Sequence, residues 1–365
     1  YEIVSRDWSS DVCSSDLGQG NTNNYSSPVQ IGTSSWTAVY GTETAAYYMK
    51  LGTTNYALGW RSYNASGNYI QNYWGDAGQW SPVQIGSSSW TAVATNAYNL
   101  SSYSAAYAIR SDNKLFAWGD GAYFAIGQVT SYSPVQIGTA NWSNVAVGFT
   151  SAAGISANSL YTWASPYTNN AENALGNQEL LFVSSPIQVG TSSWSSVSTG
   201  NNFTLAIRTG GSLFSWGFNN YGQLGLGDSI DRASPVQIGT SSWLAVANKL
   251  NDMSAFAIRS DYKLFGWGYN TYGGLGLGDT NDRNSPTIIG SSSWTSVSAG
   301  TGNTLAIRSD KTLWSWGQNG YGELGLGNTT AYSSPVQVGT SSWTAVSISR
   351  SEEHTSELQS RETIS

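Results

Sequence analysis

The sequence predicts an all-β protein of the β-propeller class. Three observations lead to this prediction: a proline motif returns about every fifty residues, tryptophans stand at fixed distances from it, and each copy holds four short β-rich segments. A repeat of about this length is typical of propellers and solenoid arrays. Helical periodicity is absent from these segments.

The proline motif reads Ser-Pro-(Val/Ile/Thr)-(Gln/Ile)-(Ile/Val)-Gly. Its prolines are Pro28, Pro82, Pro134, Pro186, Pro235, Pro286 and Pro335. A tryptophan follows each proline at an offset of eight residues: Trp36, Trp90, Trp142, Trp194, Trp243, Trp294 and Trp343. A second series consists of Trp60, Trp118, Trp163, Trp216, Trp267 and Trp316. Thirteen of the 17 tryptophans therefore fall in register, which chance does not explain.

The best-preserved copy shows how one repeat is built. It contains the segments SPVQIG, TSSW-LAV, AFAIRSD and KLFGWG, each bounded by Gly, Ser, Asn or Asp. Asp and Gly between the third and fourth segments suit a hairpin turn. We expect four antiparallel strands per blade, with radial repetition protecting the sheet edges. The repeats fall near residues 28–81, 82–133, 134–185, 186–234, 235–285 and 286–334, with a partial copy at 335–349.

A longer motif carries a family resemblance. Residues 216–227, 267–278 and 316–327 read Trp-Gly-x-Asn-x-Tyr-Gly-(Gln/Gly/Glu)-Leu-Gly-Leu-Gly. Together with the proline motif, these segments resemble the regulator-of-chromosome-condensation repeat family, and the resemblance covers residues 18–349. It implies a seven-bladed propeller, of which we expect six complete four-stranded blades and an incomplete seventh.

The chain departs from that family at one position. The family repeat carries a histidine before the third strand, where this chain has Phe203, Asn303 and Ser151. We interpret these residues as structural replacements. The resemblance therefore carries over no activity that uses the histidine, and guanine-nucleotide exchange becomes a less favoured function.

The two ends share nothing with the repeat. Residues 1–17 and 350–365 read as translations of a short-read sequencing adapter in opposite orientations, and we expect them to be adapter-derived rather than native. The domain would then comprise residues 18–349 of a truncated fragment. The excluded ends hold the only cysteine and the only histidine, Cys13 and His354, and contribute −5 of the formal net charge of −7.

The composition of residues 18–349 excludes several classes of protein. Without cysteine, neither a disulfide framework nor a thiolate zinc site can form. No apolar run approaches the roughly 20 residues of a membrane-spanning helix. A near-neutral body without a basic stripe argues against a nucleic-acid partner. We expect a monomer with no cofactor and no metal.

A basic rim is the first candidate surface. Five residues share one repeat position, at the end of the third segment: Lys50, Arg110, Arg208, Arg259 and Arg308. In a closed ring they would form a circle that suits an acidic partner. Under the alternative interpretation, Asp112, Asp261 and Asp310 neutralise arginines two residues earlier.

The degraded repeats provide the second candidate surface. The first three copies diverge from the others and add aromatic residues, which are favoured binding anchors. The candidate binding residues there are Trp60, Arg61, Tyr69, Trp74, Trp80, Tyr98, Tyr103 and Tyr167. Sequence drift in a repeat protein is the alternative explanation.

The acidic turns raise two further possibilities. Asp228 with Asp231, and Asp279 with Asp282, could hold calcium, but the next copy has Asn328 and no second acid, which favours turn caps. The Leu-Gly-Leu-Gly segments resemble phosphate loops only in composition, because no helix follows them.

The function that fits best is a non-catalytic, protein-binding scaffold that recognises a partner through loops on one face. The alternative is an extracellular or cell-surface adhesin that binds carbohydrate through loop aromatics, and the composition slightly favours that location. An enzyme is less favoured, because residues 18–349 lack Cys and His. A glycosidase would need two carboxylates facing one cleft.

Overall fold

The computed structural model describes residues 3–6, 38–41, 47–51, 54–58, 62–63, 69–70, 83–84, 88–98, 103–119, 131–148, 151–164, 175–176, 185–248, 253–320, 322–347 and 356–359. Side chains are described within residues 88–94, 106–118, 134–148 and the ranges from 151 to 347. All regular structure in these ranges is β. None of it is a helix long and apolar enough to cross a membrane.

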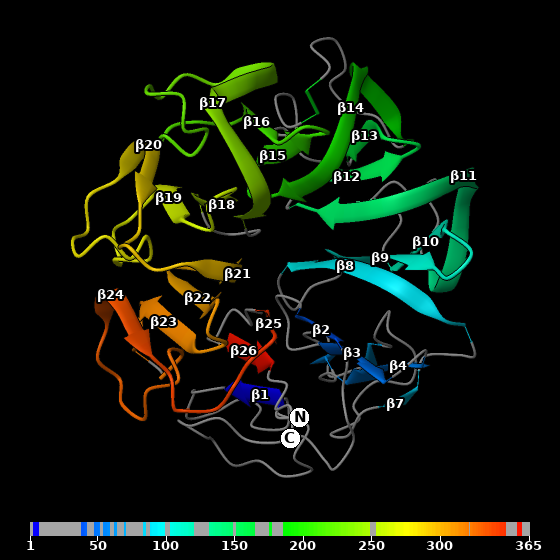
Figure 1. Cartoon of the computed structure of the whole chain (residues 1–365). Helices are drawn as coiled ribbons and strands as arrows, with labels where there is room; N and C mark the ends of the chain where they lie inside the picture. The colour runs from blue at the N-terminus through cyan, green and yellow to red at the C-terminus, as the bar shows by residue number, and fades with distance from the viewer. Residues whose placement is uncertain are drawn as a thin grey trace.

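Antiparallel four-stranded blades stand around a central axis (Figure 1). The first is β2 (Ala38–Gly41), β3 (Tyr47–Leu51), β4 (Thr54–Leu58) and β7 (Val83–Gln84). The strands that follow are β8 (Trp90–Tyr98), β9 (Tyr103–Arg110), β10 (Lys114–Gly119), β11 (Ser131–Val147), β12 (Ser151–Ser156), β13 (Ser159–Ala164), β14 (Ile187–Thr199), β15 (Phe203–Arg208), β16 (Ser212–Gly217), β17 (Arg232–Asn248), β18 (Ser254–Arg259), β19 (Leu264–Gly268), β20 (Arg283–Ile288), β21 (Trp294–Ala299), β22 (Asn303–Arg308), β23 (Leu313–Gly317) and β24 (Tyr332–Gln337). The predicted all-β propeller with six four-stranded blades is confirmed.

The seventh position holds a smaller sheet. β25 (Ala345–Val346) pairs with β26 (Ser356–Gln359), which pairs with β1 (Ile3–Arg6). β25 lies beside β21 and β22, and β26 lies beside β2, so both ends of the chain meet here (Figure 1). A two-stranded pair, β5 (Ser62–Tyr63) and β6 (Tyr69–Ile70), completes the described elements. β1 and β26 fall in the ends assigned above to an adapter, an origin that stays a prediction.

Three long strands pass from one blade to the next. The first part of β17 pairs with β16, as in Phe214↔Gln237, and its second part pairs with β18, as in Trp243↔Arg259. β11 and β14 do the same. The proline motif therefore forms the outer strand of one blade, and the tryptophan segment after it forms the innermost strand of the next. The sequence repeat is offset from the blade, which is completed by the first strand of the following copy.

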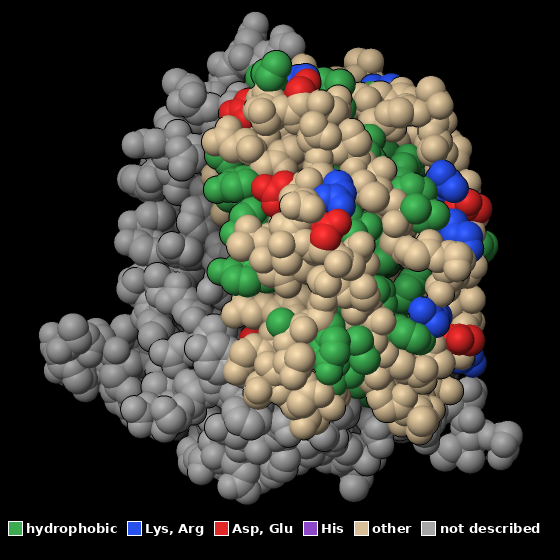
Figure 2. All heavy atoms as spheres, turned by 90° about the vertical axis from the view of Figure 1, so that its left-hand side faces the viewer, with side chains coloured by type: hydrophobic (Ala, Val, Ile, Leu, Met, Phe, Trp, Pro, Cys, Tyr) green, Lys and Arg blue, Asp and Glu red, His purple; other side chains and the backbone are tan. Residues whose placement is uncertain are grey.

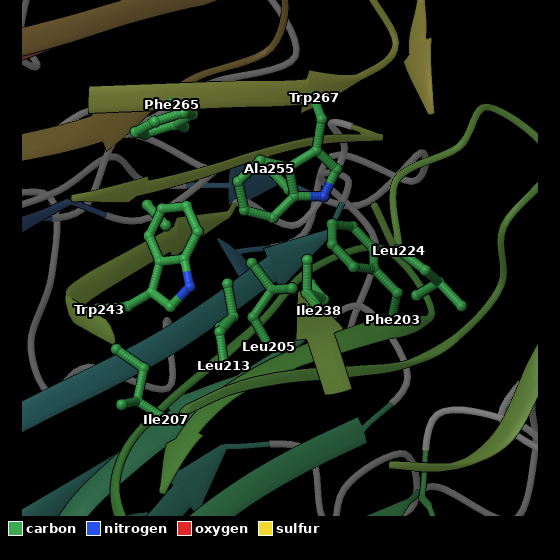
Figure 3. Packing of buried hydrophobic residues seen from close by; sticks show 11 residues of the cluster. Phe203, Leu205, Ile207, Leu213, Leu224, Ile238, Trp243, Ala255, Phe265 and Trp267 are labelled. Carbon is green, nitrogen blue, oxygen red and sulfur yellow. The ribbon is translucent and has the colours of Figure 1, made fainter. Parts of the chain in front are cut away.

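The core lies between the blades. Phe203 and Leu205 of β15 face Trp243 and Trp267 of the next blade, and all four are buried (Figure 3). Within each blade from β8 to β24 the two tryptophan series meet, with ring centroids 6.4 Å apart for Trp243 and Trp267. Such aromatic pairs contribute about 0.5–1.5 kcal/mol beyond the area they bury. The two series in the sequence are thus the repeated element of the inter-blade core.

The Leu-Gly-Leu-Gly loops pack against the tryptophans of the following blade. Trp267 Nε1 donates to the carbonyl of Gln223 at 2.9 Å, and Trp316 Nε1 donates to that of Gly274 at 2.7 Å. Gly276 has a φ of +73°, and a Cβ on it would lie 2.6 Å from Trp316 Nε1. These glycines therefore allow close approach between blades.

Candidate binding surfaces

The strand order gives the described propeller two distinct faces. In each regular blade, a tight hairpin joins the second and third strands at one end, as at Arg208–Ser212. The Leu-Gly-Leu-Gly loop leaves the third strand at the opposite end, as at Gly217–Arg232. We call these the hairpin face and the loop face. The basic-rim position lies on the hairpin face.

Two of the predicted rim arginines are neutralised. Arg110 donates from Nε and Nη2 to the carboxylate of Asp112, at 3.0 and 2.5 Å. Arg259 makes the same two bonds to Asp261, at 3.0 and 2.7 Å. These bonds lower the pKa of each aspartate to about 2. Each guanidinium also lies over a phenylalanine ring. At these two positions the interpretation of hairpin arginines paired with acids is confirmed.

The other two described rim arginines are held differently. The Arg208 guanidinium lies 3.9 Å from the centroid of Phe214 and 5.1 Å from that of Trp194. Arg308 lies 3.3 Å from the centroid of Trp314, and burial lowers its pKa. Among the described residues, neither Nε has a hydrogen-bond partner.

The expected neutralisation of Arg308 by Asp310 is not a direct contact. Asp310 instead accepts from the backbone N and the Oγ1 of Thr312, at 3.0 and 2.6 Å. Of Lys50, the structure describes only the backbone, in β3. The described part of the rim is therefore a mixture of ion pairs and stacked arginines. Figure 2 shows acidic and basic side chains interspersed on one side of the molecule.

On the loop face, the acidic turns are internally bonded. The Asn219 side chain donates to the backbone carbonyls of Asp228 and Ile230, at 3.0 and 3.1 Å, and its backbone N donates to Asp231. Asp228 also binds Arg232 at 2.6 Å. The backbone N–H of Ile230, followed by Arg232, lowers the pKa of Asp228.

The next copy repeats this network with Asn270, Asp279, Asp282 and Arg283. Within the described residues, no group of three or more His, Cys, Asp or Glu side chains converges on a common point. The geometry therefore fits the interpretation of these acids as turn caps rather than calcium ligands.

A groove of about 590 Å³ separates two successive loops on the loop face. Asn220, Tyr221, Asp228 and Ser229 line one side, and Asp282, Arg283 and Asn284 line the other. The backbone N of Gly227 donates to the carbonyl of Asn284 at 2.8 Å, which joins the two loops. Tyr221 is 40% exposed beside the groove.

The residues at the family's histidine position are buried. Phe203 packs in the inter-blade cluster, and Ser151 and Asn303 are also inaccessible. Their burial fits the interpretation as structural replacements.

The aromatic candidates of the first three repeats lie outside the described side chains. Tyr69, Tyr98 and Tyr103 are described only as backbone of β6, β8 and β9. Five more lie outside the described residues altogether: Trp60, Arg61, Trp74, Trp80 and Tyr167. Their role in binding stays a prediction.

Two exposed side chains on the hairpin face were not singled out in the sequence. Leu244 is 52% exposed and Tyr262 is 51% exposed. Both stand in regular repeats, where aligning the copies would have revealed a leucine in place of Ser or Thr and a tyrosine in place of Asn, Gly or Lys.

Comparison with known families and proteins relates this chain to repeat proteins of one kind. The regulator of chromosome condensation (RCC1) repeat matches residues 210–247, 262–307 and 310–356, and a second description of it matches residues 194–223 and 294–323. The ultraviolet-B receptor UVR8 of Arabidopsis thaliana is 26% identical over 191 residues, which are 50% of this chain and 43% of the receptor. The probable E3 ubiquitin-protein ligase HERC3 of Homo sapiens is 35% identical over 95 residues, 26% of this chain and 9% of the ligase. The chain thus matches less than half the length of these relatives.

Solved structures agree on the fold. Prp20p from Saccharomyces cerevisiae, studied for its binding to Gsp1p and histones, superposes with a TM-score of 0.78 at 15% identity, covering 99% of this chain and 92% of Prp20p. Human WBSCR16 gives a TM-score of 0.76 at 15% identity, covering 99% of this chain and 100% of that protein. At this identity the likeness concerns architecture alone.

Proposed function

We propose that this chain, a β-propeller built from RCC1 repeats, is a non-catalytic protein-binding scaffold that recognises its partner through the loops of one face. The observation that carries the proposal is the way in which the described aspartate side chains are hydrogen-bonded. Each of them accepts hydrogen bonds from its own turn or from a neighbouring arginine. Side chains occupied in this way support turn geometry rather than acid–base chemistry.

The family supports the proposal from a second direction. Yeast Prp20 has been crystallised with Kap60 bound to it, so a protein that contains a propeller of this architecture binds another protein. The innermost strands β11, β14, β17 and β21 carry no Asp or Glu. A carboxylate-pair glycosidase sited on these strands is therefore disfavoured.

The test begins with partner capture on the immobilised chain, followed by reconstitution with each purified candidate and titration calorimetry. We expect a stoichiometric complex whose affinity falls when Trp74 and Trp80 are both replaced by Ser. Both lie outside the two tryptophan series, so their loss should spare the core. A Tyr221→Ser variant serves as the control on the described loop face. Failure of every purified candidate to form a stoichiometric complex would refute the proposal.

The groove on the loop face supports a second candidate, carbohydrate binding. An exposed tyrosine beside amide and carboxylate side chains is the chemistry that holds a sugar ring and its hydroxyls. Glycan-array binding that disappears in Tyr221→Ser and persists in Trp74→Ser would favour this function over protein recognition.

A further inference from the structure

The repeat allows each residue to be compared with its counterparts in other blades. In most blades, a Ser or Thr follows the tryptophan of the innermost strand. Its side-chain hydroxyl donates a hydrogen bond to a backbone carbonyl of the neighbouring strand. The bonds are Thr91 to Ile109 at 3.1 Å, Ser143 to Ile155 at 3.3 Å, Ser195 to Ile207 at 3.2 Å and Thr295 to Ile307 at 3.3 Å. In the β17–β20 blade this residue is Leu244, which makes no such bond and is 52% exposed. Leu244 therefore lacks the hydrogen bond that its counterparts make and leaves about half of its surface exposed to solvent.

The hairpin of the same blade contains a second departure. Tyr262 has a φ of +64° and is 51% exposed. Its counterparts in the other described hairpins are Asn113, Asn158, Gly211 and Lys311. A bulky aromatic residue in the left-handed region is strained, whereas Asn and Gly adopt it readily. This strain is a sign that the side chain serves a purpose other than the turn.

Arg208 is the third departure, in the hairpin of the preceding blade. Thr209, Gly210 and Gly211 follow it, so the acid that pairs with Arg110 or Arg259 is missing. Two aromatic rings hold the guanidinium in place, and its Nε has no hydrogen-bond partner among the described residues. Among the described residues, no acidic side chain forms an ion pair with this fixed cation.

The backbone segments that carry the three departures are adjacent on the hairpin face. The backbone N of Trp243 donates to the carbonyl of Gly211 at 2.8 Å, which ties the start of this strand segment to the Arg208 hairpin. Trp243 also pairs with Arg259, which opens the Tyr262 hairpin. Leu244, the next residue, therefore lies between the two hairpins.

We propose that Arg208, Leu244 and Tyr262 form a docking site for a short peptide segment of a partner protein that carries an apolar side chain and, a few residues away, a carboxylate. The inference rests on the proposed protein-binding function and adds to it one contact site on the hairpin face and the chemistry of the ligand of that site. The guanidinium fork complements a carboxylate, and its stacked position reduces the entropy lost on binding. Leu244 and Tyr262 supply the apolar contact, and tyrosine and arginine are enriched among binding hot spots.

The repeat itself supplies the variants that test this site. Leu244→Ser restores the residue found at Ser195, and Tyr262→Asn restores the residue found at Asn113. Both changes should leave the fold intact or stabilise it. Arg208→Gln removes the charge and keeps most of the stem that packs on the rings. Arg259→Gln is the matched control, because Asp261 already neutralises that arginine.

The experiment selects a displayed library of random twelve-residue peptides against the whole chain, and measures the enriched peptides by fluorescence anisotropy. We expect them to combine Asp or Glu with an apolar residue. Each of Arg208→Gln, Leu244→Ser and Tyr262→Asn should weaken binding, and the triple variant should lose at least about tenfold in affinity. Arg259→Gln should change it little.

The possible failures can be told apart. Enriched peptides that bind the triple variant as tightly as the parent would overturn the docking site, while leaving peptide recognition elsewhere on the propeller intact. A library that yields no binder would also overturn the site. The broader scaffold function would then be decided by the calorimetry with purified partners described above.

Discussion

A single hydrogen-bonded ion pair decides how Asp261 titrates. Arg259 donates twice to this carboxylate and holds its pKa at about 2. Because the folded pKa lies below the unfolded one, the pair stabilises the fold above about pH 4, and the contribution fades as the pH falls toward 2. A carbon-13 NMR titration should give a midpoint near that low value, and Arg259→Gln should raise it toward about 3.9. Asp310 is the control, because Thr312 is the main cause of its lowered pKa. An Asp261 midpoint that stays low in Arg259→Gln would contradict this assignment.

Substituting two glycines of one loop can distinguish the cost of backbone strain from the cost of overpacking. Gly276 and Gly278 both have positive φ, at +73° and +85°. A Cβ on Gly276 would lie 2.6 Å from Trp316 Nε1, whereas the nearest atom to one on Gly278 is Ser334 Oγ at 3.5 Å. Gly278→Ala should therefore cost about 1–2 kcal/mol in unfolding free energy. Gly276→Ala adds overpacking and should cost roughly 2–5 kcal/mol. Denaturant unfolding measures both, and equal losses would show that the close approach to Trp316 is unimportant.

At the scale of one element, the β18–β19 hairpin stores strain that a point change can release. Tyr262 occupies the left-handed region, where Asn113 sits in the β9–β10 hairpin. Tyr262→Asn should stabilise the chain by about 1 kcal/mol, because Asn tolerates this conformation better than a bulky side chain. Tyr262→Phe keeps the strain and should leave stability unchanged in the same thermal unfolding measurement. Destabilisation by Tyr262→Asn would mean that the tyrosine ring contributes to the fold itself.

The sequence predicts a structural feature well when the feature depends on residue spacing within one repeat, and poorly when it depends on the folded geometry. Trp243 and Trp267 are predictable as a repeated pair because every complete copy contains both series, and the pairing of Arg259 with Asp261 follows from their spacing. Asp310 has the same spacing from Arg308 but binds Thr312 instead. The spacing does not predict this, because the contact depends on how the hairpin places the Thr312 hydroxyl beside the carboxylate. Leu244 reads as an ordinary strand residue in a single copy. It stands where the strand register shifts between Trp243 and Ala245, and one sequence segment does not reveal that shift.

At the scale of the whole molecule, the blades from β14 to β24 depend on one another for burial. Clusters of comparable make-up join each blade to the next, and β15, β18 and β22 are buried along nearly their whole length. A blade that cannot bury its faces alone should not unfold alone. In native-state hydrogen exchange with increasing denaturant, we therefore expect the amides of these three strands to converge on one unfolding free energy. Gly276→Ala, which acts between the last two blades, should lower protection in all three strands equally. A loss confined to β18 and β22 would show instead that neighbouring blades open as separate units.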